Sequence, residues 1–464
     1  MTTSGQSGTS GFWTNASVRG LVGDADPVAA VVDAARSVVV AALDEGWDGP
    51  PYDPIVLADR LHVPVVPRDD VFDARLVAVG KTGVQIEYNP NRPPGRRRFS
   101  LAHEIAHLLF PDHRELTRNR EKTNRAAGDD WQLEVLCNLA AAEFVIPLGS
   151  FRELAGETFE LRDLLGLRRR FDVSTEAILL RAAHLHDGPV AVFAASRTEP
   201  GGSTGRYRVD YTVSPGGWDP TISLGAVLVD SVVGECTAIG YTSHADAEQW
   251  PGSSSELRID AVGIPPYPGH RLPRVVGLLH PAAPVGYSRL RPVYLVGDAV
   301  APRGSGVRLV VHIVNDRARQ WRGGFAASLR ATWPIAATDF TAWVDEDRDR
   351  LRLGAVHMTR LDADLWAAAL VAQAGYGPST RPRVRYSALQ TALVEVAGWA
   401  ADHSASVHMP RIGTGQAGGS WSIIEDLVDN EMCAHRVPVT VYDLPNQRMP
   451  NSQGVFDLQG PAPA

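Results

Sequence analysis

Hydrophobic residues recur along this chain with two different periods, and the changes of period divide it into parts. Helical spacing dominates from residue 27 to 186, and alternation of apolar and polar residues takes over from 188 to about 285. A length of 464 residues suggests two to four domains. We therefore expect a disordered tail at 1–24, a first domain at 25–187, a small mainly-β middle domain at 188–287, an α/β domain at 288–446 and a flexible tail at 447–464.

The strongest helical pattern is residues 99–110, FSLAHEIAHLLF. No Gly or Pro interrupts this stretch and Pro111 follows it, so we expect one helix that ends there. His103 and His107 are four residues apart and project from one face of such a helix, with Glu104 beside them. Two neutral imidazoles at this spacing suit one Zn²⁺, and the carboxylate suits a general base. The alternative is an amphipathic helix whose histidines are satisfied by hydrogen bonds.

A second helix is expected at residues 131–145, WQLEVLCNLAAAEFV. A catalytic zinc site takes three protein ligands and leaves one position open. Glu134 completes a set of two histidines and one glutamate, and Asn138, one turn further on the same face, would support a ligand from behind. Glu143 is the rival third ligand, but it lies elsewhere on the helical wheel, where its other interpretation is an exposed carboxylate near the helix end.

These two motifs, RRRFSLAHEIAHLLF followed by ExxCNxxAAEFVIP, resemble the ImmA/IrrE family of zinc metallopeptidases over about residues 27 to 187. The resemblance implies an α+β zincin-like metallopeptidase with a helical extension. It also implies that His103, His107 and Glu134 bind Zn²⁺ and that Glu104 is the catalytic general base. Known members cleave repressor-type transcription regulators, sometimes in response to DNA damage or other stress. A repressor with a DNA-binding domain is therefore the expected protein partner.

Composition bears on the expected partners and cellular location of the protein. A formal net charge of −8 argues against a wholesale nucleic-acid binder, so direct nucleic-acid binding is not expected. The three cysteines, Cys137, Cys236 and Cys433, are scattered, which is typical of a reducing cytoplasm. No apolar run approaches the ~18 residues of a membrane span, and the N-terminus lacks the regions of a signal peptide. We expect a cytoplasmic protein without a membrane partner.

Three polar features each have two interpretations. The cluster of Arg96, Arg97 and Arg98 either clamps a substrate or, as we favour, is a solvated loop edge that pairs with nearby acids. The charged segment 111–130 is either an exposed loop or a mobile rim over the cleft. Short helices within 151–186 have the outline of a helix-turn-helix, for which we favour a packing role over DNA contact.

From about residue 290 the pattern becomes α/β, and two strands run into glycine-rich turns that open helices. The first turn follows a buried strand at 307–314, and the second, GTGQAGG at 413–419, follows a strand at 404–409. Small residues allow close approach, and backbone N–H groups at a helix start face an anion. Two such loops on one sheet suit a diphosphate. The alternative is a pair of tight strand-to-helix turns alone.

The segments GDAVAP, VHIVND, GGFA and HMPRIGTGQAGGSW resemble a macrodomain, the ADP-ribose-binding α/β/α fold, over about residues 290 to 444. The similarity looks closest to the branch that includes terminal ADP-ribose glycohydrolases. It implies that Asp298 meets the adenine, that Asn315 lies near the distal ribose and that Tyr442 stacks on the adenine. The implied ADP-ribose-binding residues are Asp298, Asn315, Gly323, Gly324, Phe325, Gly413, Thr414, Gly415, Gln416, Ala417, Gly418 and Tyr442.

The sequence departs from the hydrolytic pattern of that branch, in which a Lys after the central strand and an Asp in the second glycine loop perform the chemistry. The best-matching positions here are Gln373, or a neighbour in VAQAGYG, and Ala417, which neither form a lysyl adduct nor act as a base. ADP-ribose binding is therefore favoured over hydrolysis. His312 and Asp316 are the remaining candidates for a different chemical route.

Taken together, the patterns predict a zinc-dependent endopeptidase that cleaves a repressor-type regulator in a stress response. Its macrodomain is expected to sense or target ADP-ribose, a related NAD-derived ligand or an ADP-ribosylated partner. Two alternatives stay open at this level: a non-proteolytic regulator whose zinc is structural, and an ADP-ribosyl hydrolase whose peptidase-like half is a binding module.

Overall fold

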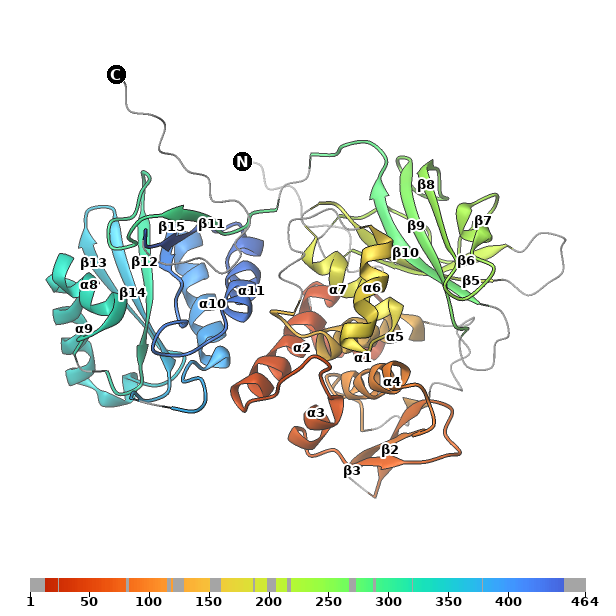
Figure 1. Ribbon diagram of the computed structural model, residues 1–464, viewed down its shortest axis with the longest axis horizontal. Helices are drawn as coiled ribbons and strands as arrows, with labels where there is room; N and C mark the ends of the chain where they lie inside the picture. Colours follow the sequence, from red (N-terminus) through yellow and green to blue (C-terminus); the bar gives the residue numbers. More distant parts are fainter. Residues whose placement is uncertain are drawn as a thin grey trace. The chain divides into compact units, whose positions relative to one another are not determined.

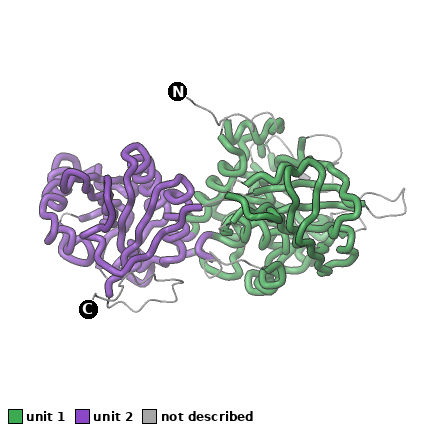
Figure 2. Tube along the Cα trace, turned by 90° about the horizontal axis from the view of Figure 1, so that it is seen from above, with its two compact units in different colours: residues 1–42, 47–147, 153–288 green, residues 43–46, 148–152, 289–464 purple. Residues whose placement is uncertain are grey.

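The computed structural model describes residues 13–445 except 24, 81–82, 115–117, 120–128, 151–159, 187, 198–205, 215–217, 267–272, 287–288, 319 and 378. The chain divides into two compact units (Figure 2): unit 1 is residues 1–42, 47–147 and 153–288, and unit 2 is 43–46, 148–152 and 289–464. A further division of unit 1 near residue 187 stays a prediction. Within the described ranges, none of the helices combines the length and hydropathy that a bilayer crossing requires.

The first part of the chain combines helices with a small mixed sheet (Figure 1). Its strands pair in the order β1-β3-β2-β4, with β1 parallel to β3 and the other pairs antiparallel. The elements are α1 (Ala16–Val22), α2 (Pro27–Asp44), α3 (Pro54–Arg60), β1 (Val65–Pro67), β2 (Ala74–Val79), β3 (Gly83–Tyr88), α4 (Pro94–His107), β4 (Arg118–Asn119), α5 (Asp130–Val145), α6 (Leu161–Phe171) and α7 (Thr175–Leu185).

Two helices that are buried over much of their length form the centre of this part. Residues 99–107 of α4 and 135–145 of α5 are buried, and the two helices pack against each other. A helix that is apolar on all sides belongs in a core, which is where α5 lies. On its other side α4 covers β2 and β3, so the small sheet and α5 enclose it.

The rest of unit 1 is a six-stranded antiparallel sheet in the order β7-β6-β5-β10-β9-β8. One face is filled by an apolar core in which Phe193 and Trp250 meet edge to face at 4.9 Å. Helix α7 packs on β5 and β10. The elements are β5 (Ala191–Arg197), β6 (Tyr207–Val213), β7 (Val227–Leu228), η3 (Val232–Glu235), β8 (Thr242–Glu248), β9 (Leu257–Ile264) and β10 (Arg274–Pro281).

Unit 2 is a mostly parallel six-stranded sheet in the order β11-β16-β15-β12-β14-β13, with β13 antiparallel to β14. Figure 1 shows α8 and α9 on one side of this sheet and α10 and α11 on the other. The elements are β11 (Val293–Val296), β12 (Arg308–Asn315), α8 (Gly324–Thr332), α9 (Pro334–Glu346), η4 (Arg348–Arg350), β13 (Val356–Asp362), β14 (Leu365–Gln373), α10 (Tyr386–Asp402), β15 (Ser406–Pro410), α11 (Trp421–Glu431), η5 (Cys433–His435) and β16 (Val439–Asp443).

The expected disorder up to residue 24 is wrong for the part that the structure describes. Asn15 caps α1 by accepting hydrogen bonds from the N–H groups of Ser17 and Val18. The backbone N–H groups of Thr14 and Asn15 donate to Oε1 of Gln132 at 2.8 and 2.9 Å. A contact with α5, more than a hundred residues away in the sequence, orders this segment, and the local Ser/Thr/Gly composition carries no sign of it.

The bounds of the histidine-bearing helix also differ from expectation. α4 begins at Pro94, a residue well suited to a first helical turn, and ends at His107, so the arginine cluster is helical rather than part of a loop. The expected pairing with acids is confirmed: Arg96 Nε lies 2.7 Å from Asp73 Oδ1, and Arg98 pairs with Asp172.

Two other expectations meet the structure differently. The alternation at 188–285 favours strands throughout, but residues 236–241 form none, because the chain there leaves η3 through turns and enters β8 only at Thr242. The charged segment 111–130 lies largely outside the described residues, and so does the start of the segment 151–186, for which short helices are expected.

We expect the stability of unit 2 to fall as the pH drops from 6.5 toward 4. Burial lowers the pKa of His312, on β12, to about 4, whereas an unfolded histidine titrates near ~6.5. Between these values the unfolded state binds the proton and the folded state does not. The free energy of unfolding therefore decreases by up to about 1.4 kcal/mol per pH unit.

His312→Phe should remove this share of the pH dependence, and His403→Gln, at the exposed end of α10, should leave it unchanged. Thermal unfolding followed by tryptophan fluorescence measures the effect, because the rings of His312 and Trp321 lie 4.6 Å apart. Equal pH slopes for wild type and His312→Phe would contradict the expectation.

Candidate functional site

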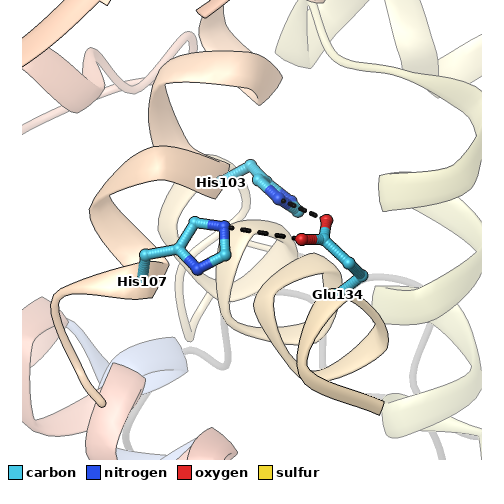
Figure 3. Close-up of side chains that lie close together, drawn as sticks. All are labelled: His103, His107 and Glu134. Carbon is cyan, nitrogen blue, oxygen red and sulfur yellow. Dashed lines mark ion pairs between the residues drawn. The ribbon is translucent and has the colours of Figure 1, made fainter. Parts of the chain in front are cut away.

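Three side chains from α4 and α5 converge in unit 1: His103, His107 and Glu134 (Figure 3). His103 Nε2 lies 3.1 Å from Glu134 Oε2, and His107 Nε2 lies 3.9 Å from Glu134 Oε1. The two histidine side chains are 0% and 2% exposed, and Glu134 is 13% exposed. The group is therefore compact and nearly dry, and Glu134 forms its most exposed edge.

The donor set suits a zinc ion. Protein nitrogen and carboxylate oxygen bind Zn²⁺ at about 2.0–2.2 Å in a tetrahedron, whose corners are then about 3.3 Å apart. The two separations of 3.1 and 3.9 Å bracket this value. Two histidines and one carboxylate also leave one corner open, as a catalytic site requires. No second group of three such ligands occurs within the described part of the chain.

Asn138 holds the first histidine in a defined tautomer. Its Oδ1 lies 2.9 Å from His103 Nδ1. An amide oxygen only accepts, so Nδ1 carries the proton and Nε2 keeps its lone pair on the side of Glu134. Asn138 Nδ2 lies 3.5 Å from Glu176 Oε1, and this carboxylate determines which end of the amide faces the histidine. The predicted position of Asn138 behind a candidate ligand is therefore what the structure has.

Glu176, on α7, connects this amide to the second sheet. The hydroxyl of Tyr211 on β6 donates to Glu176 Oε1 at 2.5 Å, and the guanidinium of Arg274 on β10 lies 3.3 Å from Oε2 and 3.4 Å from Oε1. The arginine supplies the charge that a buried carboxylate needs. A continuous series of polar contacts therefore runs from the six-stranded sheet to His103.

Two more contacts fix the remaining polar groups of α4. Cys137 Sγ lies 3.4 Å from His107 Nδ1, which holds the second imidazole from behind. The backbone N–H of Leu76 on β2 donates to Glu104 Oε2 at 2.9 Å. Glu104 is 1% exposed, so the small sheet positions this carboxylate beside the histidines in a nearly dry site.

Glu143 belongs to a different contact. Its Oε1 lies 2.5 Å from Arg181 Nη1, and the two side chains are 4% and 1% exposed. The interpretation of Glu143 as an exposed carboxylate is wrong, because Arg181 on α7 draws it into the interior as an ion pair. The same contact turns Arg181 away from solvent, which agrees with the packing role favoured for these helices.

In unit 2 the two glycine loops meet. A Cβ built on Gly323 would lie 3.3 Å from Nε2 of Gln416. Gly413 has φ +77°, and a Cβ there would lie 2.7 Å from Ile424 Cδ1, so this position requires glycine. The first loop leads into α8 and the second into α11. The side chain of Gln416, in the second loop, therefore lies beside the backbone of the first loop at Gly323.

Three of the residues predicted to bind the nucleotide form side-chain hydrogen bonds to the backbone of their own turns. Asp298 Oδ1 accepts from the N–H of Val300 at 3.1 Å, and Asn315 Oδ1 accepts from the N–H of Arg317 at 3.0 Å. The Thr414 hydroxyl donates to the carbonyl of Arg411 at 2.8 Å. The exposed fractions differ along the loops: Gly323, Gly324, Gly415, Gln416 and Gly418 are exposed, Phe325 is half-buried, and Gly413 and Ala417 are buried.

Tyr442 lies inside unit 2, with 3% of its surface exposed. Its hydroxyl accepts from the N–H of Arg303 at 2.9 Å, and burial raises its pKa. A Cβ built on Gly297 would lie 3.3 Å from the ring. In this structure the ring therefore supports the turn that carries Asp298.

The residues at the hydrolytic positions are engaged by backbone. Gln373 Nε2 donates to the carbonyl of Gly375 at 2.9 Å, and the carbonyl of Ala417 accepts from Arg383 at 2.7 Å. Asp316 Oδ1 accepts from the N–H of Gly375 at 2.7 Å. His312 is 2% exposed, with a lowered pKa, so its imidazole is a neutral core group.

Sequence reasoning missed four of the supporting residues. Cys137 enters the sequence analysis only as one of three scattered cysteines, although it lies three residues after Glu134 and next to Asn138, on the same face of the helix. That spacing was the available signal. Glu176, Tyr211 and Arg274 lie far along the chain from the two motifs, and no local pattern connects them.

A group of two histidines and one glutamate on two packed helices, with a glutamate beside the first histidine, is the architecture of a metallopeptidase site. Residues 67–183 match the family model of the IrrE N-terminal-like domain, a peptidase family, so the chain carries such a domain. The radiation response metalloprotease IrrE of Deinococcus deserti is 36% identical over 117 residues, which are 24% of this chain and 41% of that protein. The chain thus spans less than half of this relative.

The C-terminal part matches solved macrodomains. A macrodomain protein from Streptomyces coelicolor is 39% identical, and the match covers 33% of this chain and 99% of that one, with a TM-score of 0.30. On this sequence identity, the C-terminal part of the chain belongs to the macrodomain family. Thermosipho africanus DarTG, solved in complex with ADP-ribose, is 18% identical over 31% of this chain and 40% of that one, with a TM-score of 0.26.

We expect Glu143→Gln to lower stability without changing the metal content, and Glu134→Gln to lower the metal content with little change in stability. Glu143→Gln leaves Arg181 buried without its carboxylate, which should lower the free energy of unfolding by about 3–5 kcal/mol while the zinc content of folded protein stays unchanged. Glu134→Gln should abolish stoichiometric zinc and change the stability of the metal-free protein little.

Denaturant unfolding and elemental analysis measure the two quantities. The double variant Glu143→Leu, Arg181→Met should recover most of the lost stability, because it leaves no unpaired charge. Loss of zinc from folded Glu143→Gln would contradict the assignment of that residue to structure.

Proposed function

We propose that unit 1 is a zinc-dependent endopeptidase with a zincin-like site, in which His103, His107 and Glu134 hold the metal. The observation that carries this proposal is the convergence of their donor atoms within 4.8 Å, at separations that fit a tetrahedral ion. The match of residues 67–183 to a peptidase family supports it. A bound zinc ion would supply Lewis-acid polarisation and a water of lowered pKa.

Each residue of this chain then has a stated part in the reaction. Glu104 takes a proton from the attacking water at its carboxylate and returns it to the leaving amine. The Leu76 amide keeps that carboxylate in place. Asn138 and Cys137 keep the two imidazoles oriented, so that both Nε2 lone pairs face the same point. Burial of the group excludes competing water.

We further propose that the substrate is a repressor-type transcription regulator cleaved in a stress response. The resemblance to the ImmA/IrrE family supports this choice, and the Deinococcus deserti relative is itself named a radiation response metalloprotease. Within this proposal the protein acts in the cytoplasm, where such regulators are found.

We expect Glu104→Gln to lower proteolysis by about 10²–10⁴-fold, the contribution of a positioned general base. The amide accepts the Leu76 hydrogen bond but takes no proton, so the fold and the zinc content should stay unchanged. Cleavage of a proteome-derived peptide library, read by mass spectrometry, measures the rate. Glu160→Gln, an exposed acid on unit 1, is the matched control and should cleave like wild type. A Glu104→Gln variant with wild-type cleavage would show that the site is not a peptidase of this kind.

We propose that unit 2 binds ADP-ribose, a related NAD-derived ligand or an ADP-ribosylated partner. The proximity of the Gln416 side chain to Gly323 supports this, because it places the two glycine loops next to each other, where backbone N–H groups can face a diphosphate. Membership in the macrodomain family supports it as well, as does a DarTG structure that contains ADP-ribose. Tyr442 supports the Asp298 turn from inside the sheet.

Hydrolysis of ADP-ribose linkages is not part of this proposal. Gln373 and Ala417 are the best matches in this sequence to the Lys and Asp that perform it in the related branch, and both are engaged with neighbouring backbone. We propose instead that ligand binding in unit 2 senses a signal for the peptidase or targets it.

We expect Gly415→Glu to weaken binding of ADP-ribose by at least about tenfold, because a carboxylate in the loop repels the diphosphate. The position is exposed and a Cβ there meets nothing within 4 Å, so the substitution is sterically free. Gly398→Glu, on the exposed face of α10 and equally open, is the matched control. Isothermal titration calorimetry with ADP-ribose measures both. Equal affinity in the two variants would place the ligand elsewhere or nowhere.

A further inference from the structure

A cavity of about 200 Å³ lies beside the metal-binding group in unit 1. It is lined by Trp131, Glu134, Val135 and Asn138 of α5, by residues 208–211 of β6, and by 224–225. Glu134 belongs both to this wall and to the histidine group. A peptide whose scissile bond lies at the group would therefore place a neighbouring residue in the cavity.

The volume of the cavity indicates which part of a peptide it can hold. Its volume is below the about 300–1,000 Å³ of pockets that hold cofactor-sized ligands. One amino-acid side chain fits such a space. Trp131 and Val135 give the wall an apolar part that would hold the aliphatic portion of that side chain.

A β-bulge sets the direction of two cavity residues. Against β5, Arg208 pairs with Ser196 and Tyr211 pairs with Ala194. The two β5 residues are two positions apart and share a face, whereas the two β6 residues are three positions apart. Asp210 is the extra residue of a bulge, and its insertion brings Arg208 and Tyr211 to the same face.

That face points toward the helices, because the Tyr211 hydroxyl donates to Glu176 on α7. Arg208 is the cation of the cavity. Its guanidinium makes neither a hydrogen bond nor an ion pair with any residue that the structure describes, and it is partly exposed. Asp210, by contrast, already accepts the hydroxyl of Ser196 at 2.5 Å.

The charge balance favours an anion in this place. A divalent ion on the histidine group would offset the negative charges of the two acids in the cavity wall, Glu134 and Asp210. The guanidinium of Arg208 then leaves the cavity with a net positive charge, and it offers donors in a fork that matches a carboxylate.

We propose that this cavity is the specificity pocket of the peptidase and that Arg208 selects substrates with Asp or Glu in the residue that the pocket holds. The inference rests on the proposed peptidase function of the same site. It makes the second sheet a wall of the active site, in addition to its polar connection to His103.

The test uses the full, zinc-loaded chain and a positional-scanning hexapeptide library. Peptide binding is measured on the Glu104→Gln variant, which retains the metal ligands. Peptide cleavage is measured on the chain that keeps Glu104. At one position Asp or Glu should bind about tenfold or more better than Asn or Gln, as expected for a charge-assisted hydrogen bond. Arg208→Gln should remove this preference, and Arg208→Glu should turn it toward Lys and Arg. Arg206→Gln, exposed and outside the cavity wall, is the control that should retain it.

The outcomes separate the pocket from the peptidase. Cleavage without an acidic preference, or with one that survives Arg208→Gln, overturns the pocket and leaves the peptidase standing. A preference of the pocket for Lys or Arg in the peptide, if Asp210→Asn removes it, also overturns the proposed acidic specificity. An acidic preference in binding that depends on Arg208, with no cleavage by the wild-type chain, supports the pocket and overturns the peptidase. No binding of any peptide overturns the pocket.

Discussion

The packing of α4 against α5 is the constraint on which the metal-binding group depends. Residues 99–107 of α4 and 135–145 of α5 are buried, so the contact between the two helices is dry and close. Polar groups in such a contact are costly unless they meet partners. His103, His107 and Glu134 meet one another there, and Asn138 and Cys137 lie directly behind the histidines. The hydrophobic contact thereby sets the geometry of the polar site.

The six-stranded sheet is joined to this site by polar contacts of its own. Glu176 accepts hydrogen bonds from Asn138 and Tyr211 and forms an ion pair with Arg274. Because a buried carboxylate is stable only with such partners, the sheet and the histidine-bearing helices are mutually dependent. Two side chains, Glu176 and Asn138, therefore link the sheet to His103. A change in the sheet that moves them would alter the orientation of the imidazole.

Unit 2 follows a different principle, in which backbone rather than side chains forms the candidate site. Glycines in the loops that follow β12 and β15 lead the chain into α8 and α11, and the side chains of Asp298, Asn315 and Thr414 hold turns. Such a surface suits recognition of phosphate and ribose. It offers no evident base at the positions where a related branch performs hydrolysis, which agrees with a sensing or targeting module.

The sequence by itself determined what depends on local spacing. Histidines four residues apart share a helix face, Glu134 and Asn138 share another, and glycine turns follow buried strands, so the candidate ligands and both glycine loops were predictable. Only the tertiary structure decided the rest: Glu143 pairs with Arg181, residues 14 and 15 dock on Gln132, and a bulge at Asp210 turns Arg208 toward the cavity beside Glu134. These contacts join residues from 38 to 118 positions apart or depend on strand register, and neither is encoded in the period of a single segment.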